Sequence, residues 1–198
     1  MKVLFATTNP AKIKRYADKL QERNIEVLTI KDLEINLKPE ETGKNAIENA
    51  YIKAKAYYDV TKITTIGMDN SLFIEELPGE RQPGTHVRRI NGKELNDDEM
   101  IEYYCNLVNE YGEKLTAKWV YGMVIYDGKE PKKYSWSKSH FYFVSKPCER
   151  RNPGYPLDSI SIMPECNKYF VDLTEEDRNK NRENYKEDDV IDFIADNV

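Results

Sequence analysis

Residues that could bind phosphate or a metal ion occur at several positions in the first seventy of the chain. Asn9 and Lys12 follow a short apolar run, Lys53 lies further along after Glu40, Glu41 and Glu48, and Asp69 follows a second apolar run. A helix amino terminus exposes unpaired N–H groups and a partial positive charge, so it attracts phosphate. Carboxylates near such lysines suit Mg²⁺, which is usually held by one or two carboxylates and by substrate phosphates. These residue types are compatible with binding phosphate and Mg²⁺, but their spacing does not by itself join them into one site.

Each of these residues also has a structural explanation. Asn9 followed by Pro10 is typical of a capped helix, on which Lys12 would simply face solvent. Asp69 after a strand is as well suited to cap a turn as to bind metal or to act as a general base. The basic residues after a Pro-Gly turn, Arg88 and Arg89 with His86, fit an anion clamp or an ordinary basic surface. Spacing alone leaves these alternatives open.

Composition excludes several other functions. The 198 residues carry 30 basic and 35 acidic side chains, a net charge of −5, without a concentrated basic block. Such a chain is a poor candidate for binding polymeric nucleic acid. No apolar run approaches the roughly 20 residues that cross a bilayer, and no signal peptide opens the sequence, so we expect a cytoplasmic protein without membrane contact. Length favours a single domain, residues 1–198.

The histidines and cysteines do not form a metal or disulfide framework. His86 and His140 are not at zinc-ligand spacing. Cys105, Cys148 and Cys166 are few, odd in number and far apart, so we expect reduced thiols.

The first half of the chain has the pattern of an α/β fold. A strand over residues 2–6 is followed by an amphipathic helix capped by Asn9, and by a strand over residues 27–30. A second helix is expected over residues 45–58, ending before Thr61, because Asn45 and Glu48 resemble a capping box. A strand over residues 63–68 then delivers Asp69 at its carboxyl end, where α/β sheets place their chemistry.

The second half indicates that the sheet is mixed. An irregular stretch over residues 77–92 precedes a helix over residues 97–111, and residues 118–126 and 134–144 form an antiparallel hairpin around Asp127-Gly128. A loop over residues 150–156, a short strand over 159–163 and a helical region opened by Thr174 and Asp177 follow. The charge run over residues 175–189 is expected to be a solvated helical face.

The order of these motifs resembles the inosine triphosphate pyrophosphatases, which hydrolyse non-canonical purine nucleoside triphosphates. Thr7-Thr8-Asn9-Pro10-Ala11-Lys12 fits the family's Thr-x-Asn-x-x-Lys, and residues 41–54 are close to its Glu-Thr-Gly-x-Thr-Phe-x-Glu-Asn-Ala-x-x-Lys-Ala. Residues 68–72 occupy the place of Asp-Asp-Ser-Gly-Leu, and Pro83-Gly84 with Arg89 matches Pro-Gly-x-x-Ser-x-Arg. The resemblance is strong to about Arg89 and fainter beyond it.

The chain departs from the family pattern at several positions. Met68 replaces the first aspartate of the pair, which either weakens metal binding or shifts it onto Asp69 and Glu41, and Val87 replaces a serine. Residues 154–159 only echo the family's Gly-Phe-Gly-Tyr-Asp-Pro. Residues 182–184 are Arg-Glu-Asn where relatives have the Ser-His-Arg that reads the purine base. A pocket that has lost hydrogen-bonding groups for one base should prefer a different substrate.

The resemblance implies a mixed α/β sheet flanked by helices, two lobes with a cleft, and a homodimer. It implies Mg²⁺-dependent hydrolysis of a nucleoside triphosphate to monophosphate and pyrophosphate. The residues that the resemblance assigns to the triphosphate are Thr7, Thr8, Asn9, Lys12, Lys53 and Arg89. It assigns the metal to Glu41 and Asp69, and the chemistry to Asp69 and Lys53.

Two other interpretations remain open at the level of sequence. Met68 and the missing base-reading triplet also fit a nucleotide-binding module that has lost catalysis. The tyrosine-rich hairpin also fits an interaction surface, although such stretches more often form sheet and core.

Overall fold

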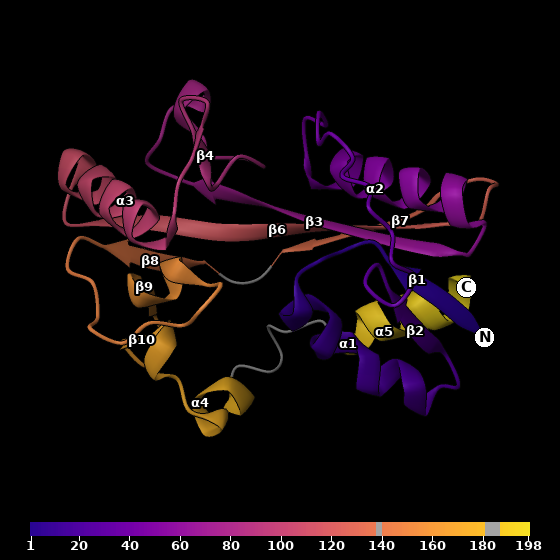
Figure 1. Ribbon diagram of the computed structural model, residues 1–198. Helices are drawn as coiled ribbons and strands as arrows, with labels where there is room; N and C mark the ends of the chain where they lie inside the picture. The colour runs from indigo at the N-terminus through magenta and orange to yellow at the C-terminus, as the bar shows by residue number, and fades with distance from the viewer. Residues whose placement is uncertain (138–139, 181–186) are drawn as a thin grey trace. The chain divides into compact units, whose positions relative to one another are not determined.

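The computed structural model describes residues 1–137, 140–180 and 187–198. The chain divides into two compact units, each described below by itself (Figure 1). The first comprises Met1–Asn70, Val120–Trp136 and Lys186–Val198, and the second comprises Ser71–Trp119 and Ser137–Tyr185. Strands β3 (Thr65–Ile74) and β6 (Lys114–Tyr126) contribute residues to both.

The first unit is built on parallel strands. β1 (Lys2–Phe5) pairs in parallel with β2 (Glu26–Thr29) on one side and with β3 on the other. β6 continues the sheet beyond β3 and also pairs with β7 (Lys132–Ser137). Helix α2 (Ala46–Thr61) lies on one side of these strands, and α1 (Pro10–Glu22) and α5 (Glu187–Asn197) lie on the other (Figure 1). This is the predicted strand, helix, strand opening.

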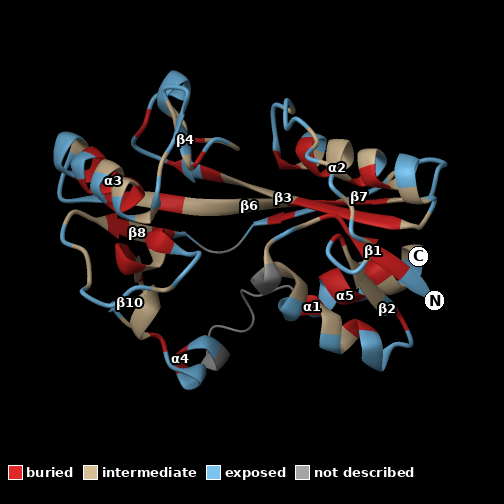
Figure 2. Cartoon of the chain, in the orientation of Figure 1, coloured by how far each residue is buried: buried red, intermediate tan, exposed pale blue. Residues whose placement is uncertain are grey.

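Alternating side chains of β3 supply both faces of the first unit. Ile66 and Met68 are buried in one core cluster with residues of α1 and α5, such as Leu20 and Ile191. On the other face, the small residues of α2 pack against β6, as Ala50 does against Val124. Buried strands between exposed helix surfaces show this layering (Figure 2). Side chains of consecutive β3 residues therefore face different helices.

The second unit holds the antiparallel part of the sheet. β6 pairs antiparallel with β8 (Phe141–Val144), β8 with β9 (Ser161–Met163), and β9 with β10 (Lys168–Tyr169). Helix α3 (Asp97–Tyr111) begins with a complete capping box between Asn96 and Glu99 and contributes Tyr104 and Leu107 to the core. The remaining elements are 3-10 turns at Gly79–Arg81, Pro156–Ser159 and Phe170–Asp172, a two-stranded ribbon of β4 (Arg89–Ile90) and β5 (Lys93–Glu94), and α4 (Glu175–Lys180).

Several predicted bounds were wrong. Helix α2 continues through Thr61 to a left-handed cap at Lys62, because the cap N–H of Lys62 bonds the Tyr58 carbonyl. The predicted hairpin partner of β6 is split into β7 and β8. Ser159 lies in a 3-10 turn, and the strand begins at Ser161.

The prediction for Asp69 needs a larger correction. Asp69, Asn70 and Ser71 lie inside β3, which runs on to Ile74, and not at its carboxyl end. The register pairs Phe5, the last residue of β1, with Ile66. Asp69 and Asn70 thus lie just past the end of β1, so the chemistry falls at the carboxyl end of a parallel strand, but of β1.

Other expectations hold within the described residues. The mixed sheet flanked by helices is as predicted, and helix 97–111 has the predicted bounds. All three cysteines are free thiols. Of the helices described, none is long and apolar enough to span a membrane. The predicted base-reading positions 182–184 lie outside the described residues.

Candidate functional site

The turn after β1 brings the amino terminus of α1 next to β3. The backbone N–H of Asn9 donates to Thr7 Oγ1 at 3.1 Å, and the Asn9 carbonyl accepts from the N–H groups of Lys12 and Ile13, which begins the helix. Lys12 Nζ then donates to Asn70 Oδ1 at 2.9 Å. The first turn of α1 and the middle of β3 therefore share one polar contact, 58 positions apart in sequence.

Helix α2 lies unusually close to the sheet, because glycines face it. A Cβ on Gly67 would lie 2.0 Å from the carbonyl oxygen of Ala50, and one on Gly122 would lie 2.6 Å from the backbone of Ala46. Glycine at both positions allows the helix backbone to touch the strands. The close approach brings the neighbours of Ala50 on α2 within reach of β3. It does the same for the helix residues one turn further along.

Asp69 is the centre of the polar cluster that results. Its Oδ1 lies 3.1 Å from Lys53 Nζ, and its Oδ2 accepts from Asn49 Nδ2 at 2.9 Å. Lys53 Nζ also lies 3.2 Å from Glu41 Oε1. The side chains of Lys53 and Asp69 are 12% and 11% exposed, whereas Glu41 is 42% exposed. Two carboxylates thus converge on one ammonium group, with one of them open to solvent.

The loop that carries Glu41 is attached to α2 at several points. Gly43 N–H donates to Asn49 Oδ1 at 2.7 Å, and Lys44 N–H donates to Glu48 Oε2 at 2.8 Å. Further back, the Tyr57 hydroxyl donates to the Leu37 carbonyl at 2.6 Å. These bonds hold the loop against the helix that supplies Lys53.

Lys12 has an unusual charge environment. Burial and, secondarily, the neighbouring Lys53 ammonium lower the pKa of Lys12 to about 8, while Asp69 and Glu41 act in the opposite direction. A lysine in this state gains from a nearby anion, because a polyanion compensates both the burial and the like charge. The cluster therefore favours a negatively charged ligand at Lys12.

Met68 lies on the opposite face of β3 from Asp69. It is 5% exposed and belongs to the apolar cluster formed with α1 and α5, whereas Asp69 faces α2. Met68 therefore belongs to the hydrophobic core. The two carboxylates that converge on Lys53 are those of Glu41 and Asp69.

The donor set fits a magnesium ion bound together with phosphate. Among the described residues, no group of three or more His, Cys, Asp or Glu side chains could hold a metal ion alone. Glu41 and Asp69 already share a cation in the form of Lys53. Two carboxylates that need substrate oxygens to complete the coordination are a usual arrangement for Mg²⁺.

The first unit thus brings together Lys12, Glu41, Lys53 and Asp69, with Asn9 opening the helix that carries Lys12. Thr7 caps the Asn9 turn, and Thr8 is exposed. Arg89 is exposed in the second unit, and its assignment to the substrate stays a prediction.

Sequence reasoning missed two residues of the cluster, Asn49 and Asn70. Asn49 is 1% exposed and contacts both the Glu41 loop and Asp69, and Asn70 contacts Lys12. The signal for Asn49 was its place in the helix four residues before Lys53, on the same face. Asn70 directly follows Asp69 at the predicted strand end, where α/β sheets place their chemistry, and this signal could have found it.

These features define an α/β protein with a carboxylate and lysine cluster past the end of its first strand. The sequence model of the Ham1 family matches residues 3–186, and the chain belongs to this family. The match confirms the family resemblance found in the motifs.

Curated relatives and solved structures agree with this assignment. The dITP/XTP pyrophosphatase of Leptospira interrogans is 33% identical over 174 residues, which cover 87% of this chain and 86% of that protein. The enzyme of the same name from Aquifex aeolicus is 32% identical over 193 residues, covering 91% and 89%. The Staphylococcus aureus Ham1 structure matches with a TM-score of 0.78 and 24% identity over 98% of both chains. A Coxiella burnetii HAM1 structure gives a TM-score of 0.79 and 19% identity over 99% of both chains, so these two support the fold alone.

Proposed function

We propose that this protein is a magnesium-dependent nucleoside triphosphate pyrophosphohydrolase. It cleaves a non-canonical purine nucleoside triphosphate between the α and β phosphates and releases the monophosphate and pyrophosphate. The observation that carries the proposal is the convergence of Glu41 and Asp69 on Lys53, in the same cluster as Lys12. The names of the curated relatives support this reaction over other phosphate chemistry.

Each residue of the cluster has a role that its surroundings suit. Lys12 and Lys53 bind the triphosphate and neutralise its charge, and the N–H groups at the start of α1 add a partial positive charge. Glu41 and Asp69 would hold Mg²⁺, which when bound supplies charge neutralisation at the phosphate oxygens. Asp69 also orients the attacking water as general base, since phosphoryl transfer depends mainly on positioning and electrostatic stabilisation.

Two observations bear on the base that the protein prefers. The relatives are named for deoxyinosine and xanthosine triphosphates, which supports a purine substrate with an altered base edge. This chain has Arg-Glu-Asn at residues 182–184 in place of the base-reading triplet. We therefore include canonical triphosphates as competitors in the test.

The test offers the purified protein a panel of dITP, XTP, ITP and the canonical triphosphates with Mg²⁺. Pyrophosphate and orthophosphate are measured separately. We expect equal amounts of monophosphate and pyrophosphate, with the highest kcat/KM for a non-canonical purine. Release of orthophosphate alone would contradict cleavage between the α and β phosphates.

The panel also tests the second interpretation, a nucleotide-binding module without catalysis. Tight binding of dITP or XTP with no Mg²⁺-dependent turnover would favour that module and overturn the proposed reaction.

Homodimer formation and a cytoplasmic location also stay proposals. A monomeric mass in light scattering at micromolar concentration would rule out the homodimer under those conditions.

A further inference from the structure

The buried side chain of Asn49 bridges the Asp69 carboxylate and the backbone of the loop that carries Glu41. Its Nδ2 donates to Asp69 Oδ2 at 2.9 Å, and its Oδ1 accepts from Gly43 N–H at 2.7 Å. Asn49 is 1% exposed, on the first turns of α2. One amide thus connects β3, α2 and the loop that carries Glu41.

Chemistry alone fixes the orientation of this amide. The Asp69 carboxylate accepts hydrogen bonds when ionised, and the Gly43 N–H only donates. The amide nitrogen of Asn49 must therefore face Asp69, and its oxygen must face the loop. A flipped amide would lose both bonds and leave buried polar groups without partners, which is costly.

The surroundings leave little freedom for the loop or the amide. A Cβ on Gly43 would lie 2.6 Å from Asn49 Oδ1 and 2.7 Å from Asn49 N. The loop backbone therefore lies directly against the side chain, and only glycine permits this approach. At the next helix residue, Ala50, the backbone of α2 lies directly against Gly67 of β3, and this close approach holds the helix against the strand.

We propose that Asn49 is a positioning residue that holds Asp69 and the Glu41 loop in the arrangement needed for divalent metal binding. This inference rests on the proposed function, because it assigns Glu41 and Asp69 to the metal. Asn49 acts through these two side chains: one end of the amide orients the Asp69 carboxylate, and the other keeps Glu41 near Lys53. Without the Asn49 amide, each carboxylate samples other orientations. Metal binding then has to order both side chains, which weakens the affinity for the metal.

Asn45 provides a matched control on the same helix, one turn before Asn49. Its side chain accepts from Glu48 N–H at 3.0 Å and donates to Glu48 Oε1 at 3.0 Å, so these bonds cap α2 and do not involve Asp69 or Gly43. Asn45→Ala removes a helix cap and Asn49→Ala removes buried hydrogen bonds, so both are expected to destabilise the fold. Only Asn49→Ala should also change metal binding.

The experiment measures turnover of the best triphosphate of the panel against Mg²⁺ concentration. It also measures the binding of Mn²⁺ by electron paramagnetic resonance in the presence of inorganic pyrophosphate, whose oxygens complete the coordination that the two carboxylates leave open. For Asn49→Ala we expect the half-saturating Mg²⁺ concentration to rise at least tenfold and Mn²⁺ binding to weaken to a similar extent. Excess Mg²⁺ should restore much of the turnover, which it would not do for a general structural lesion. Asn45→Ala should stay within twofold of the wild type in both measurements.

An isosteric variant, Asn49→Asp, keeps the test decisive if Asn49→Ala does not fold. It retains an acceptor for Gly43 N–H but replaces the donor to Asp69 with a second carboxylate. We expect slow hydrogen exchange at the Gly43 amide, as in the wild type, together with at least tenfold lower kcat. Tighter Mn²⁺ binding with unchanged kcat would overturn the positioning role.

The outcomes separate this inference from the proposed function. Suppose that the wild type releases pyrophosphate, but Asn49→Ala and Asn45→Ala need the same Mg²⁺ concentration for half-maximal turnover. The positioning role of Asn49 then fails, and the proposed function stands. If the wild type hydrolyses no triphosphate, the proposed function fails, and Mn²⁺ binding still decides between the Ala variants. Weaker Mn²⁺ binding in Asn49→Ala alone would uphold the role of Asn49 in that case.

Discussion

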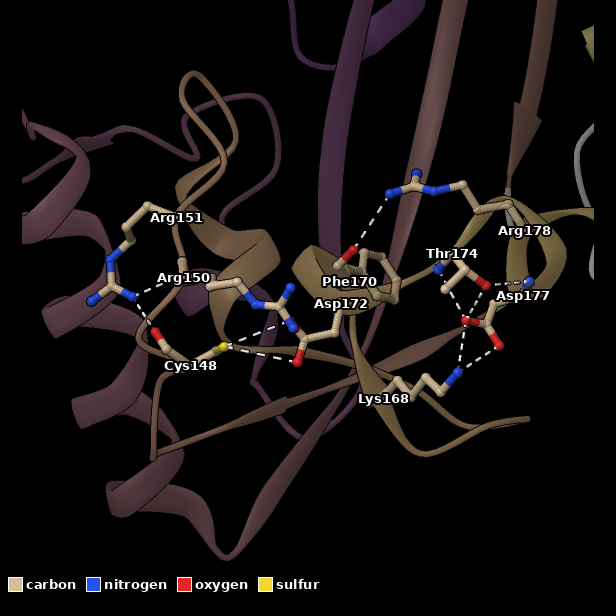
Figure 3. Close-up of polar contacts among 9 residues, drawn as sticks. All are labelled: Cys148, Arg150, Arg151, Lys168, Phe170, Asp172, Thr174, Asp177 and Arg178. Atoms are coloured by element: carbon tan, nitrogen blue, oxygen red, sulfur yellow. Dashed lines mark hydrogen bonds and ion pairs between the residues drawn. The ribbon is translucent and has the colours of Figure 1, made fainter.

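Two aspartates with the same exposure show how differently the two units use a carboxylate. The side chains of Asp69, in the first unit, and Asp177, in the second, are both 11% exposed and both paired with a lysine. Asp177 also accepts from Thr174 N–H and Thr174 Oγ1, three residues earlier, and its partner Lys168 is nine residues away (Figure 3). The partners of Asp69 lie 16 and 20 residues away.

The hydrogen bonds of Asp177 and those of Asp69 stabilise different levels of structure. Asp177 forms a capping box with Thr174 at the start of α4, and Lys168 and Thr174 hold its pKa well below the usual range. Its hydrogen bonds stabilise the local turn. The bonds of Asp69 exist only when a helix, a loop and a strand have come together. Burial and ion pairing do not separate a structural carboxylate from a candidate site, whereas the origin of its partners does.

The largest expected effect is on turnover. Asp69→Asn removes the proposed general base and a metal ligand but keeps the size of the side chain. We expect turnover to fall by at least about a hundredfold, the lower range for the loss of general base catalysis, with folding retained by circular dichroism. Asp177→Asn is the matched control, and it should keep turnover within a few-fold. Equal losses in the two variants would end the distinction between them.

The contact of α2 with β3 should be the next most sensitive feature. Gly67→Ala places a methyl group against the Ala50 carbonyl, so the helix has to shift and carry Asn49 and Lys53 away from Asp69. Overpacking of this kind costs about 2 kcal/mol of unfolding free energy. Urea denaturation would measure it, and Gly79→Ala, where nothing lies within 4 Å, is the control. A stable Gly67→Ala protein with normal turnover would show that the close approach is not needed.

A smaller effect is expected from pH, through Lys12. Its pKa of about 8 means that the free protein loses this positive charge as pH rises through 8, because burial disfavours the ammonium form. Triphosphate binding needs that charge, so kcat/KM should be level below about pH 7, about half its plateau at pH 8 and about tenfold lower near pH 9.

An arginine in place of Lys12 sharpens the pH prediction. Lys12→Arg stays charged throughout this range and should flatten the decline. The stability of the free protein should move in the opposite direction to kcat/KM. The unfolded chain binds more protons than the folded one between pH 8 and the ordinary lysine pKa, so the free energy of unfolding rises there. A profile of kcat/KM that is flat to pH 9.5 in the wild type would remove Lys12 from the substrate site.

Sequence predicted the fold and the charged members of the cluster for a physical reason. Strand, helix and cap signals depend on neighbours a few residues apart, and the Asn9 turn, the Asn45 cap and the helix at 97–111 all have such signals. Lys12, Lys53 and Asp69 stand out because charges next to strand ends and helix starts are easily recognised.

The parts that sequence did not predict depend on distant contacts. The continuation of β3 past Asp69 is set by its pairing with β6 and not by its own polar residues, which on propensity alone would end a strand. Asn49 has the pattern of a helix residue beside Glu48, and only the approach of the Gly43 loop and Asp69 gives it a second role. The metal assignment and the base remain predictions, since both require a ligand.

The smallest expected effect is at the cap of α4, and it tests the local side of the comparison. Thr174→Ala removes the hydroxyl that accepts from Asp177 N–H at 3.1 Å, so the free energy of unfolding should fall by about 1 kcal/mol, the usual cost of losing an N-cap. Thr174→Ser keeps the hydroxyl and should remain near the wild type. Turnover at saturating Mg²⁺ should change less than twofold in both, because the bonds of Thr174 and Asp177 serve their own turn. A tenfold loss of turnover in folded Thr174→Ala would mean that α4 takes part in the chemistry, and sequence distance would then no longer distinguish the two carboxylates.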